Sequence, residues 1–131
     1  MRIFLNDIQV HAHHGVMEQE ATVGGDFLVS VSMEADVERA GETDCLEDTV
    51  NYADIALLVK QEMAIRSKLL EHVATRIAKR LLAEFSAARS VKVCITKLCP
   101  PIPGLQSAGA GVELKIENSS ALTSEATTSI T

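Results

Sequence analysis

The spacing of hydrophobic side chains changes twice along this 131-residue chain, and the order of the changes limits the folds open to it. About residues 2–14 and 27–37 alternate apolar and polar side chains, as strands with one buried face do. Between Ile55 and Phe85 the spacing is helical, in two consecutive blocks. Alternation returns near 90–97 and 111–117. The order β-β-α-α-β-β predicts an α+β domain, with a four-stranded antiparallel sheet and two helices on one face.

Local signals refine this prediction. The alternation slips near Asn6-Asp7, which indicates a bulge or turn within the first strand. His14-Gly15 and Gly24-Gly25 bracket a loop between the first two strands, and about residues 40–50 form a polar connection. Ser67 is a plausible N-cap for the second helix.

The chain divides into one domain and a tail. Residues 1–118 carry all of the periodic segments and suit a single domain. Residues 119–131 lack periodicity, and eight of the thirteen are Ser or Thr, so we expect a flexible tail. A four-stranded open sheet leaves two strand edges unpaired, and such edges invite pairing with another chain.

Composition excludes several classes of function. The net charge of −6, from 18 acidic and 12 basic side chains, argues against nucleic acid and against anionic membranes as partners. No apolar run approaches the ~20 residues of a membrane span, and the N-terminus enters a strand pattern at once. Cys45, Cys94 and Cys99 are odd in number and form no CxxC pair, which favours reduced thiols. We therefore expect a cytoplasmic protein.

Lys97 ends the alternating run of residues 91–97, and the chain then meets Pro100-Pro101-Ile102-Pro103-Gly104. Proline lacks a backbone N–H and fixes φ, so this run cannot continue a strand ladder. Lys97 therefore stands where a rigid loop leaves a sheet, which is a position that often carries binding or catalytic groups. A strand that simply ends in a solvated lysine is the alternative interpretation.

Three further segments accompany the Thr96-Lys97 and Pro-rich run in a fixed order. They are His14-Gly15-Val16, Thr49-Val50-Asn51-Tyr52-Ala53-Asp54 and Leu69-Leu70-Glu71-His72. Together, over about residues 2–117, the four segments closely resemble the dihydroneopterin aldolase family of folate biosynthesis. The resemblance implies sheets of several subunits joined into a barrel with helices outside, two stacked tetrameric rings in a homo-octamer, and active sites at subunit interfaces.

The resemblance also assigns roles to residues. Glu71 would anchor the pterin ring, because a carboxylate can accept both N–H groups of the 2-amino-4-oxo edge. Leu70, Val50 and Asn51 would complete the binding of the substrate. Lys97, Tyr52 and Glu20 would form the catalytic set: Lys97 supplies charge and acid–base capacity, Tyr52 relays a proton, and Glu20 contacts the substrate side chain and the lysine.

The implied reaction is a retro-aldol cleavage of 7,8-dihydroneopterin into 6-hydroxymethyl-7,8-dihydropterin and glycolaldehyde. The N5=C6 bond of the substrate can itself accept the electrons of the C1′–C2′ bond, so the resemblance implies no Schiff base, metal or cofactor. Epimerisation at C2′ is an allowed side activity.

Other interpretations stay open. His11 and His13 lie two apart on a strand, which is a metal-ligand spacing, although a third ligand is missing. An epimerase acting on the triphosphate of the same pterin would need cations, and Arg66, Lys68 and Arg89 form no cluster in the sequence. A non-catalytic pterin-binding ring is the third alternative.

Overall fold

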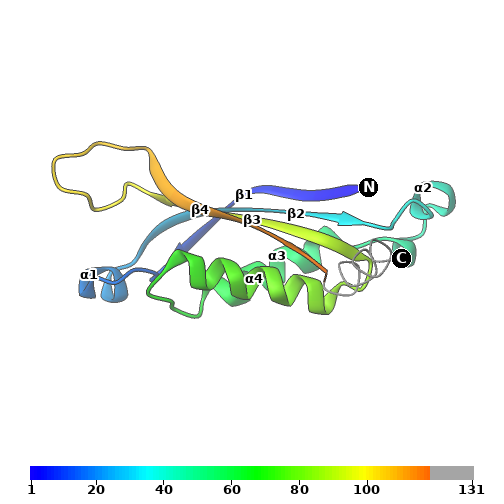
Figure 1. The fold of residues 1–131 in the computed structure, drawn as a ribbon, viewed down its shortest axis with the longest axis horizontal. Coiled ribbons are helices and arrows are strands. Elements are labelled where there is room, and N and C mark those ends of the chain that lie inside the picture. The colour runs from blue at the N-terminus through cyan, green and yellow to red at the C-terminus, as the bar shows by residue number, and fades with distance from the viewer. Residues whose placement is uncertain (119–131) are drawn as a thin grey trace, which may run out of the picture.

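The computed structural model describes residues 1–118, and the predicted tail of 119–131 lies outside the described residues. Four strands form one antiparallel sheet in the spatial order β1-β2-β3-β4 (Figure 1). Each strand therefore pairs with the one before it in the sequence, as the β-β-α-α-β-β order predicts. The strands are β1 (Arg2–Ala12), β2 (Gly25–Ala35), β3 (Ala88–Leu98) and β4 (Gly109–Glu117).

The pairing registers position the ends of the strands. In β1 and β2, Val10 faces Phe27, and the register shifts between Leu5 and Ile8. This shift confirms the predicted bulge, where Asp7 adopts a left-handed φ of 54°. In β2 and β3, Phe27 pairs with Lys97, so the end of β3 lies beside the start of β2.

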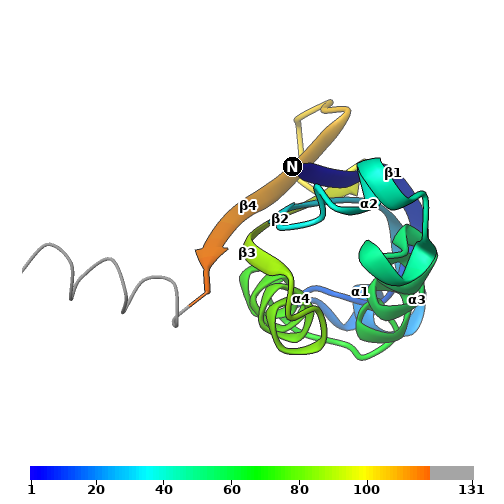
Figure 2. The same cartoon turned by 90° about the vertical axis from the view of Figure 1, so that its right-hand side faces the viewer.

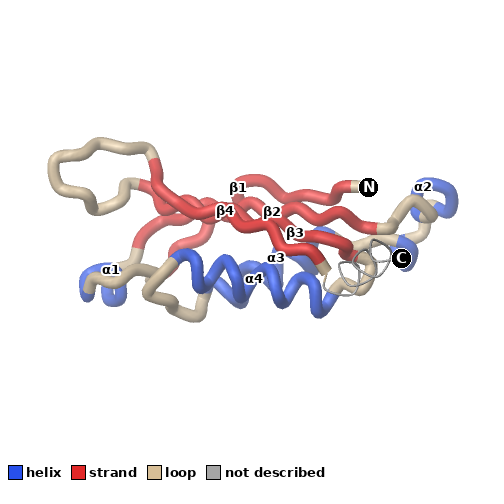
Figure 3. The backbone as a smooth tube through the Cα atoms, viewed as in Figure 1, coloured by secondary structure: helices blue, strands red, loops and turns tan. Residues whose placement is uncertain are grey.

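Two long helices cover one face of the sheet, α3 (Tyr52–Met63) and α4 (Leu70–Glu84). Figure 2 shows the sheet curving over this helical layer, and Figure 3 shows strands and helices as separate layers. The core lies between the layers, where alternate positions of the central strands meet the helical stripes. Its fully buried large side chains include Phe27, Ile95, Ile55, Ile77 and Leu81.

Both outer strands have free edges within residues 1–118. The inward-facing side chains of β1 and β4, such as Ile3, Ile8, Val112 and Ile116, are only partly buried against the core. The sheet is therefore open in the single chain.

Three short helices lie in segments that the sequence indicated as loops. They are α1 (Glu18–Thr22), α2 (Ala40–Thr43) and the 3-10 turn η1 (Leu46–Asp48). Elements of three to five residues are too short to show a helical period, so hydrophobic spacing does not reveal them.

The predicted N-cap of the second long helix was wrong. The N-cap of α4 is Leu69, two residues beyond Ser67, and no side chain caps the helix. Ser67 is instead buried in the loop between α3 and α4, where it bonds other segments. No helix within residues 1–118 is long and apolar enough to cross a membrane.

Candidate active site

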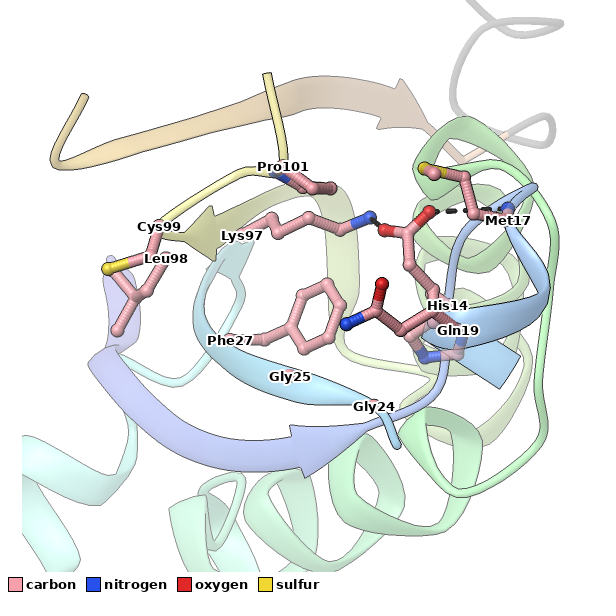
Figure 4. Close-up of a pocket in the computed structure, with 11 residues that line it drawn as sticks. His14, Met17, Gln19, Gly24, Gly25, Phe27, Lys97, Leu98, Cys99 and Pro101 are labelled. Carbon is pink, nitrogen blue, oxygen red and sulfur yellow. Dashed lines mark hydrogen bonds and ion pairs between the residues drawn. The ribbon is translucent and has the colours of Figure 1, made fainter. Parts of the chain in front are cut away.

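An ion pair between Lys97 and Glu20 joins two segments that are 77 residues apart in the sequence. Lys97 is the second-last residue of β3, and Glu20 lies in α1. The Nζ of Lys97 donates to the Glu20 carboxylate, and Figure 4 shows the Lys97 side chain running above Phe27. Both side chains are half-buried, with 16% and 15% of their surfaces exposed. Limited exposure weakens solvent screening, so this pair is held more firmly than a surface pair.

The loop before α1 is built to hold Glu20. The backbone N–H of Met17 donates to Glu20 Oε1 at 3.3 Å, and Met17 is also the N-cap residue of α1. Gly15 adopts a φ of +147°, and a Cβ at this position would collide with the carboxyl group of Glu20. Glycine is therefore required at the turn that brings Glu20 back over the sheet.

Two aromatic rings lie beneath the ion pair. The Nζ of Lys97 lies 5.7 Å from the centroid of the Phe27 ring, within the range of a cation–π contact. His14 meets the same ring edge-on, with centroids 5.5 Å apart and planes at 76°. Phe27 and His14 are both fully buried, so they form a rigid base for the pair.

His14 ties this base to the loop between the long helices. The backbone N–H of Ser67 donates to His14 Nδ1 at 3.0 Å, and the N–H of Gly15 donates to the Ser67 carbonyl at 3.1 Å. Burial lowers the pKa of His14, and the positive charges of Arg76 and Lys97 act in the same direction. A neutral imidazole with an unprotonated Nδ1 is the form that accepts the Ser67 bond.

Two arginines complete this connection. Arg66 donates to the carbonyl oxygens of His13 at 3.1 Å and of Gly15 at 2.6 Å. Arg76 donates to Ser67 Oγ at 3.0 Å, and Ser67 Oγ lies 2.7 Å from the Nδ1 of His72 in the first turn of α4. The start of α4 and the loop that carries Glu20 are thus held to the same serine.

A hollow opens on the side of the ion pair that faces α4. Lys97, Glu20 and Leu70 line it, with the loop after β3 and the start of β4; the remaining lining residues are Pro100, Pro101, Ile102, Ala110, Gly111 and Val112. Leu70 is the first residue of α4, so Glu71 follows directly in its first turn. Within residues 1–118 Glu71 is exposed.

The other three predicted residues lie apart from this group. Val50 is 7% exposed, Asn51 caps α3 by accepting from the Ala53 N–H at 2.9 Å, and Tyr52 is 64% exposed. Val50 and Asn51 line a separate hollow with Leu46, Glu47, Thr49, Asp54 and Phe85. Because α3 runs for 12 residues, about 18 Å, its first residue lies at the opposite end of the helix from the α3–α4 loop that contains Ser67.

Of the two histidines of the possible metal site, His11 uses both ring nitrogens in other contacts. His11 places Nδ1 3.1 Å from Asp26 Oδ1 and Nε2 3.1 Å from the carbonyl oxygen of Val23. The Asp26 carboxylate is the main cause that raises the pKa of His11, with the Val23 carbonyl second. Within residues 1–118 no three His, Cys, Asp or Glu side chains gather as a metal-binding group. Both ring nitrogens of His11 thus bind residues of the β1–β2 connection.

Sequence reasoning missed several residues around the pair. Phe27, Gln19 and Gly25 line the hollow beneath Lys97, and Ser67 with Arg76 forms the connection behind it. The register of β2 against β3 would have placed Phe27 opposite Lys97, but a sequence does not show register before the strands are paired.

A half-buried acid–base pair beside a hollow at the end of a strand is typical of a small-molecule enzyme site, and here it lies on an α+β fold. A family model described as dihydroneopterin aldolase matches residues 3–115. The dihydroneopterin aldolase of Staphylococcus epidermidis is 40% identical over 117 residues, which are 88% of this chain and 96% of that protein.

Solved structures agree with this match. A crystal structure of the Escherichia coli dihydroneopterin aldolase in complex with neopterin has a TM-score of 0.81 at 27% identity, and the alignment covers 88% of this chain and 98% of that chain. A Burkholderia dihydroneopterin aldolase bound to guanine has a TM-score of 0.72 at 22% identity, with 90% and 91% of the chains covered. The chain belongs to the dihydroneopterin aldolase family, whose members are lyases of folate biosynthesis.

Proposed function

We propose that this chain cleaves 7,8-dihydroneopterin into 6-hydroxymethyl-7,8-dihydropterin and glycolaldehyde, with Lys97, Glu20 and Tyr52 as catalytic residues. The half-buried Lys97–Glu20 pair, next to the first turn of α4, is the observation that carries the proposal. The neopterin complex of the E. coli relative supports a pterin as the ligand.

The pterin ring binds at the start of α4 in this proposal. Glu71 accepts the two N–H groups of the 2-amino-4-oxo edge, and Leu70 packs against the ring. The 2-amino-6-oxo edge of guanine carries the same adjacent N–H groups as the 2-amino-4-oxo edge of a pterin, so the guanine bound to the Burkholderia relative supports recognition of this edge. Glu71 also lies in the first turn of a 15-residue helix, where the positive end of the helix dipole stabilises a carboxylate.

The chemistry needs a proton acceptor for the C2′ hydroxyl and a proton donor for C1′. The C1′–C2′ electrons move into the N5=C6 system of the substrate, C2′ leaves as the aldehyde, and a proton added to C1′ restores the N5=C6 bond. Lys97 and Glu20 supply charge and proton transfer beside this bond. Lys97 is engaged with a carboxylate, whereas a lysine that acts as a nucleophile stands desolvated or next to another cation. The proposal therefore uses no Schiff base, and re-addition of the aldehyde on the other face of C2′ gives the epimerase activity.

Tyr52, Asn51 and Val50 enter the site from a neighbouring subunit in this proposal. Their distance from Lys97 within one chain and the free edges of β1 and β4 support an assembly that joins sheets between subunits. The resemblance of the chain to its family favours an octamer of two stacked tetrameric rings.

Mixing two inactive variants tests the shared site. Lys97→Ala and Tyr52→Phe subunits, denatured together and refolded, should regain activity, because about one quarter of randomly assembled sites contain both native residues. Each variant refolded alone is the control. No recovery in a mixture that forms the native oligomer would place Tyr52 and Lys97 of one site in the same subunit. Full activity of Tyr52→Phe refolded alone would remove Tyr52 from the catalytic set.

The scarcity of cations around the two hollows beside the Lys97–Glu20 pair disfavours the triphosphate epimerase. Lys97 is the one Lys or Arg among the residues 1–118 that line either hollow, and Glu20 already neutralises it. Glycolaldehyde release from dihydroneopterin and from its triphosphate, measured side by side, tests the proposal. Turnover restricted to the triphosphate would overturn it in favour of the epimerase, and no turnover of either would favour a binding protein.

A further inference from the structure

The Lys97–Glu20 pair stands between two hollows, and Pro101 contributes to the wall of both. One hollow leads to Leu70 and Glu71. The other lies beneath the pair, between α1 and the start of β2; its lining consists of His14, Met17, Gln19, Glu20, Gly24, Gly25, Phe27, Lys97, Leu98, Cys99 and Pro101. We call this second space the lower hollow (Figure 4).

We infer that the lower hollow is a subsite for the polyhydroxyalkyl chain of the substrate, and that Gly25 sets the length of chain that it accepts. This inference rests on the proposed function. If the ring binds at Glu71 and the C1′–C2′ bond lies at Lys97, then the departing part of the chain extends past the ion pair, away from Leu70. The lower hollow is the space on that side.

The lining of the lower hollow suits a short polyol. The Gln19 amide, which both donates and accepts, reaches across the hollow towards Phe27 below the ion pair (Figure 4). The Lys97 ammonium and the Glu20 carboxylate supply a donor and an acceptor at its upper wall. Phe27 and Leu98 provide apolar surface for the C–H groups of the chain. Such a mixture of a few polar groups on an apolar wall is typical of small-ligand sites.

Gly25 leaves room in this hollow that any other residue would fill. It begins β2, and because it lies two residues before Phe27 its Cβ position is on the same face of the sheet. A Cβ built on Gly25 meets no atom within 4 Å, so the position opens on free space. The adjacent Gly24 differs, because its φ is +77° and a Cβ there would lie 2.6 Å from the Ala12 carbonyl oxygen. Gly24 is thus required by the backbone, whereas Gly25 is open to larger side chains.

The free space predicts turnover of a longer substrate, a 7,8-dihydropterin with a tetrahydroxybutyl chain at C6. The reaction is the same: the C2′ hydroxyl loses its proton, the C1′–C2′ bond breaks, its electrons enter the N5=C6 system, and C1′ gains a proton. The ring product is again 6-hydroxymethyl-7,8-dihydropterin. The fragment that leaves is a three-carbon hydroxyaldehyde, glyceraldehyde, in place of glycolaldehyde, so the two substrates are distinguished by their products.

The test compares kcat/KM for the longer substrate and for dihydroneopterin in the full-length protein, in Gly25→Ala and in Gly25→Val. The wild-type protein should release glyceraldehyde, and the ratio of the two kcat/KM values should fall in each variant, by about tenfold or more in Gly25→Val. Gly41→Ala is the matched control, since a Cβ at Gly41 also meets nothing within 4 Å but lies in α2, outside the hollow, and it should keep the wild-type ratio.

Each remaining outcome overturns one specific claim. A wild-type protein that cleaves dihydroneopterin but not the longer substrate, or Gly25 variants that keep the wild-type ratio, would overturn the subsite. If Gly25→Val does not fold, the ratio of the two kcat/KM values in Gly25→Ala alone decides whether the subsite stands. If the wild-type protein cleaves neither substrate, the proposed function fails, and the subsite is then decided by the dissociation constants of the two pterins: equal weakening of both in Gly25→Ala would overturn it.

Discussion

Ser67 donates its backbone N–H to the Nδ1 of His14 across 3.0 Å, and this bond joins the two segments that carry the acidic residues of the site. His14 leads into the loop with Glu20, and Ser67 leads into the start of α4 with Glu71. The bond is buried at both partners, so its loss would leave a polar group without water. The spacing between Glu20 and Glu71 therefore depends on a histidine that stays neutral.

Acid should weaken the fold through His14. Burial lowers the folded-state pKa of His14 below its usual 6.5. Between these two values the unfolded chain binds more protons, so the free energy of unfolding falls as the pH drops below about 6.5, with a slope of at most about 1.4 kcal/mol per pH unit from this group. Urea denaturation of wild-type protein and His14→Gln between pH 7 and pH 5 should show the steeper loss in wild type.

His11→Gln provides a control of opposite sign. The pKa of His11 is raised by Asp26 and Val23, so its contribution is complete below pH 6.5 and is lost as the pH rises through the folded-state pKa. Parallel stability curves for wild type and His14→Gln would show that His14 does not titrate on unfolding.

Arg76 should contribute more to stability than an exposed lysine pair. Its guanidinium bonds Glu62 Oε2 at 3.0 Å, the Ile65 carbonyl at 2.7 Å and Ser67 Oγ at 3.0 Å, and the Glu62 side chain is only 12% exposed. Arg76→Ala leaves these acceptors without their donor, with an expected cost of about 2–4 kcal/mol in the free energy of unfolding.

The matched control for Arg76→Ala is Lys92→Ala. Lys92 also forms a short ion pair, 2.9 Å from Glu113, but the two side chains are 49% and 58% exposed. Its loss should cost about 0–1 kcal/mol. An equal decrease in the free energy of unfolding for the two variants would contradict this prediction, because water would then replace the contacts of Arg76 at no cost in stability.

The strands, the two long helices and the bulge at Asp7 could be predicted because each leaves a periodic signal, or a break in one, in the sequence. Alternation places Phe27 on the buried face, and helical spacing places Ile55 and Ile77 in the core. Lys97 and Glu20 were predicted to act together only through the resemblance, and they do form a pair. Spacing alone does not connect residues 77 positions apart.

The serine in the α3–α4 loop shows why the rest could not be predicted. Ser67 stands where an N-cap is expected, yet its groups bond His14, His72 and Arg76. Contacts between loops follow no period, so they become visible only when the helices and the sheet are assembled. The exposure of Glu71 is a similar case, since it follows from how the described elements pack and not from spacing along the sequence.

Lys97→Ala should lower kcat far more than it weakens pterin binding, because in the proposed mechanism the ammonium acts beside the breaking bond and not on the ring. We expect kcat to fall by about 10²–10⁴-fold and the dissociation constant of 6-hydroxymethyl-7,8-dihydropterin to change by less than about tenfold. Lys92→Ala, five residues earlier on β3 and exposed, is the control. Borohydride added during turnover of wild-type protein should trap no adduct; a substrate fragment covalently attached to Lys97 would establish Schiff-base chemistry instead.

Glu71→Gln should mainly weaken pterin binding, whereas Lys97→Ala should mainly lower kcat. Glutamine keeps the length of the side chain but removes the charge that, in our proposal, accepts both N–H groups of the pterin edge. Charge-assisted hydrogen bonds contribute about 1.5–3 kcal/mol each. The dissociation constant of 6-hydroxymethyl-7,8-dihydropterin, measured by calorimetry, should therefore rise by about 10–100-fold. At saturating substrate, kcat should fall less than in Lys97→Ala. Glu84→Gln removes a carboxylate at the other end of α4, where it pairs with Arg80, and should leave the affinity unchanged. Equal affinities of Glu71→Gln and wild type would remove Glu71 from the pterin site.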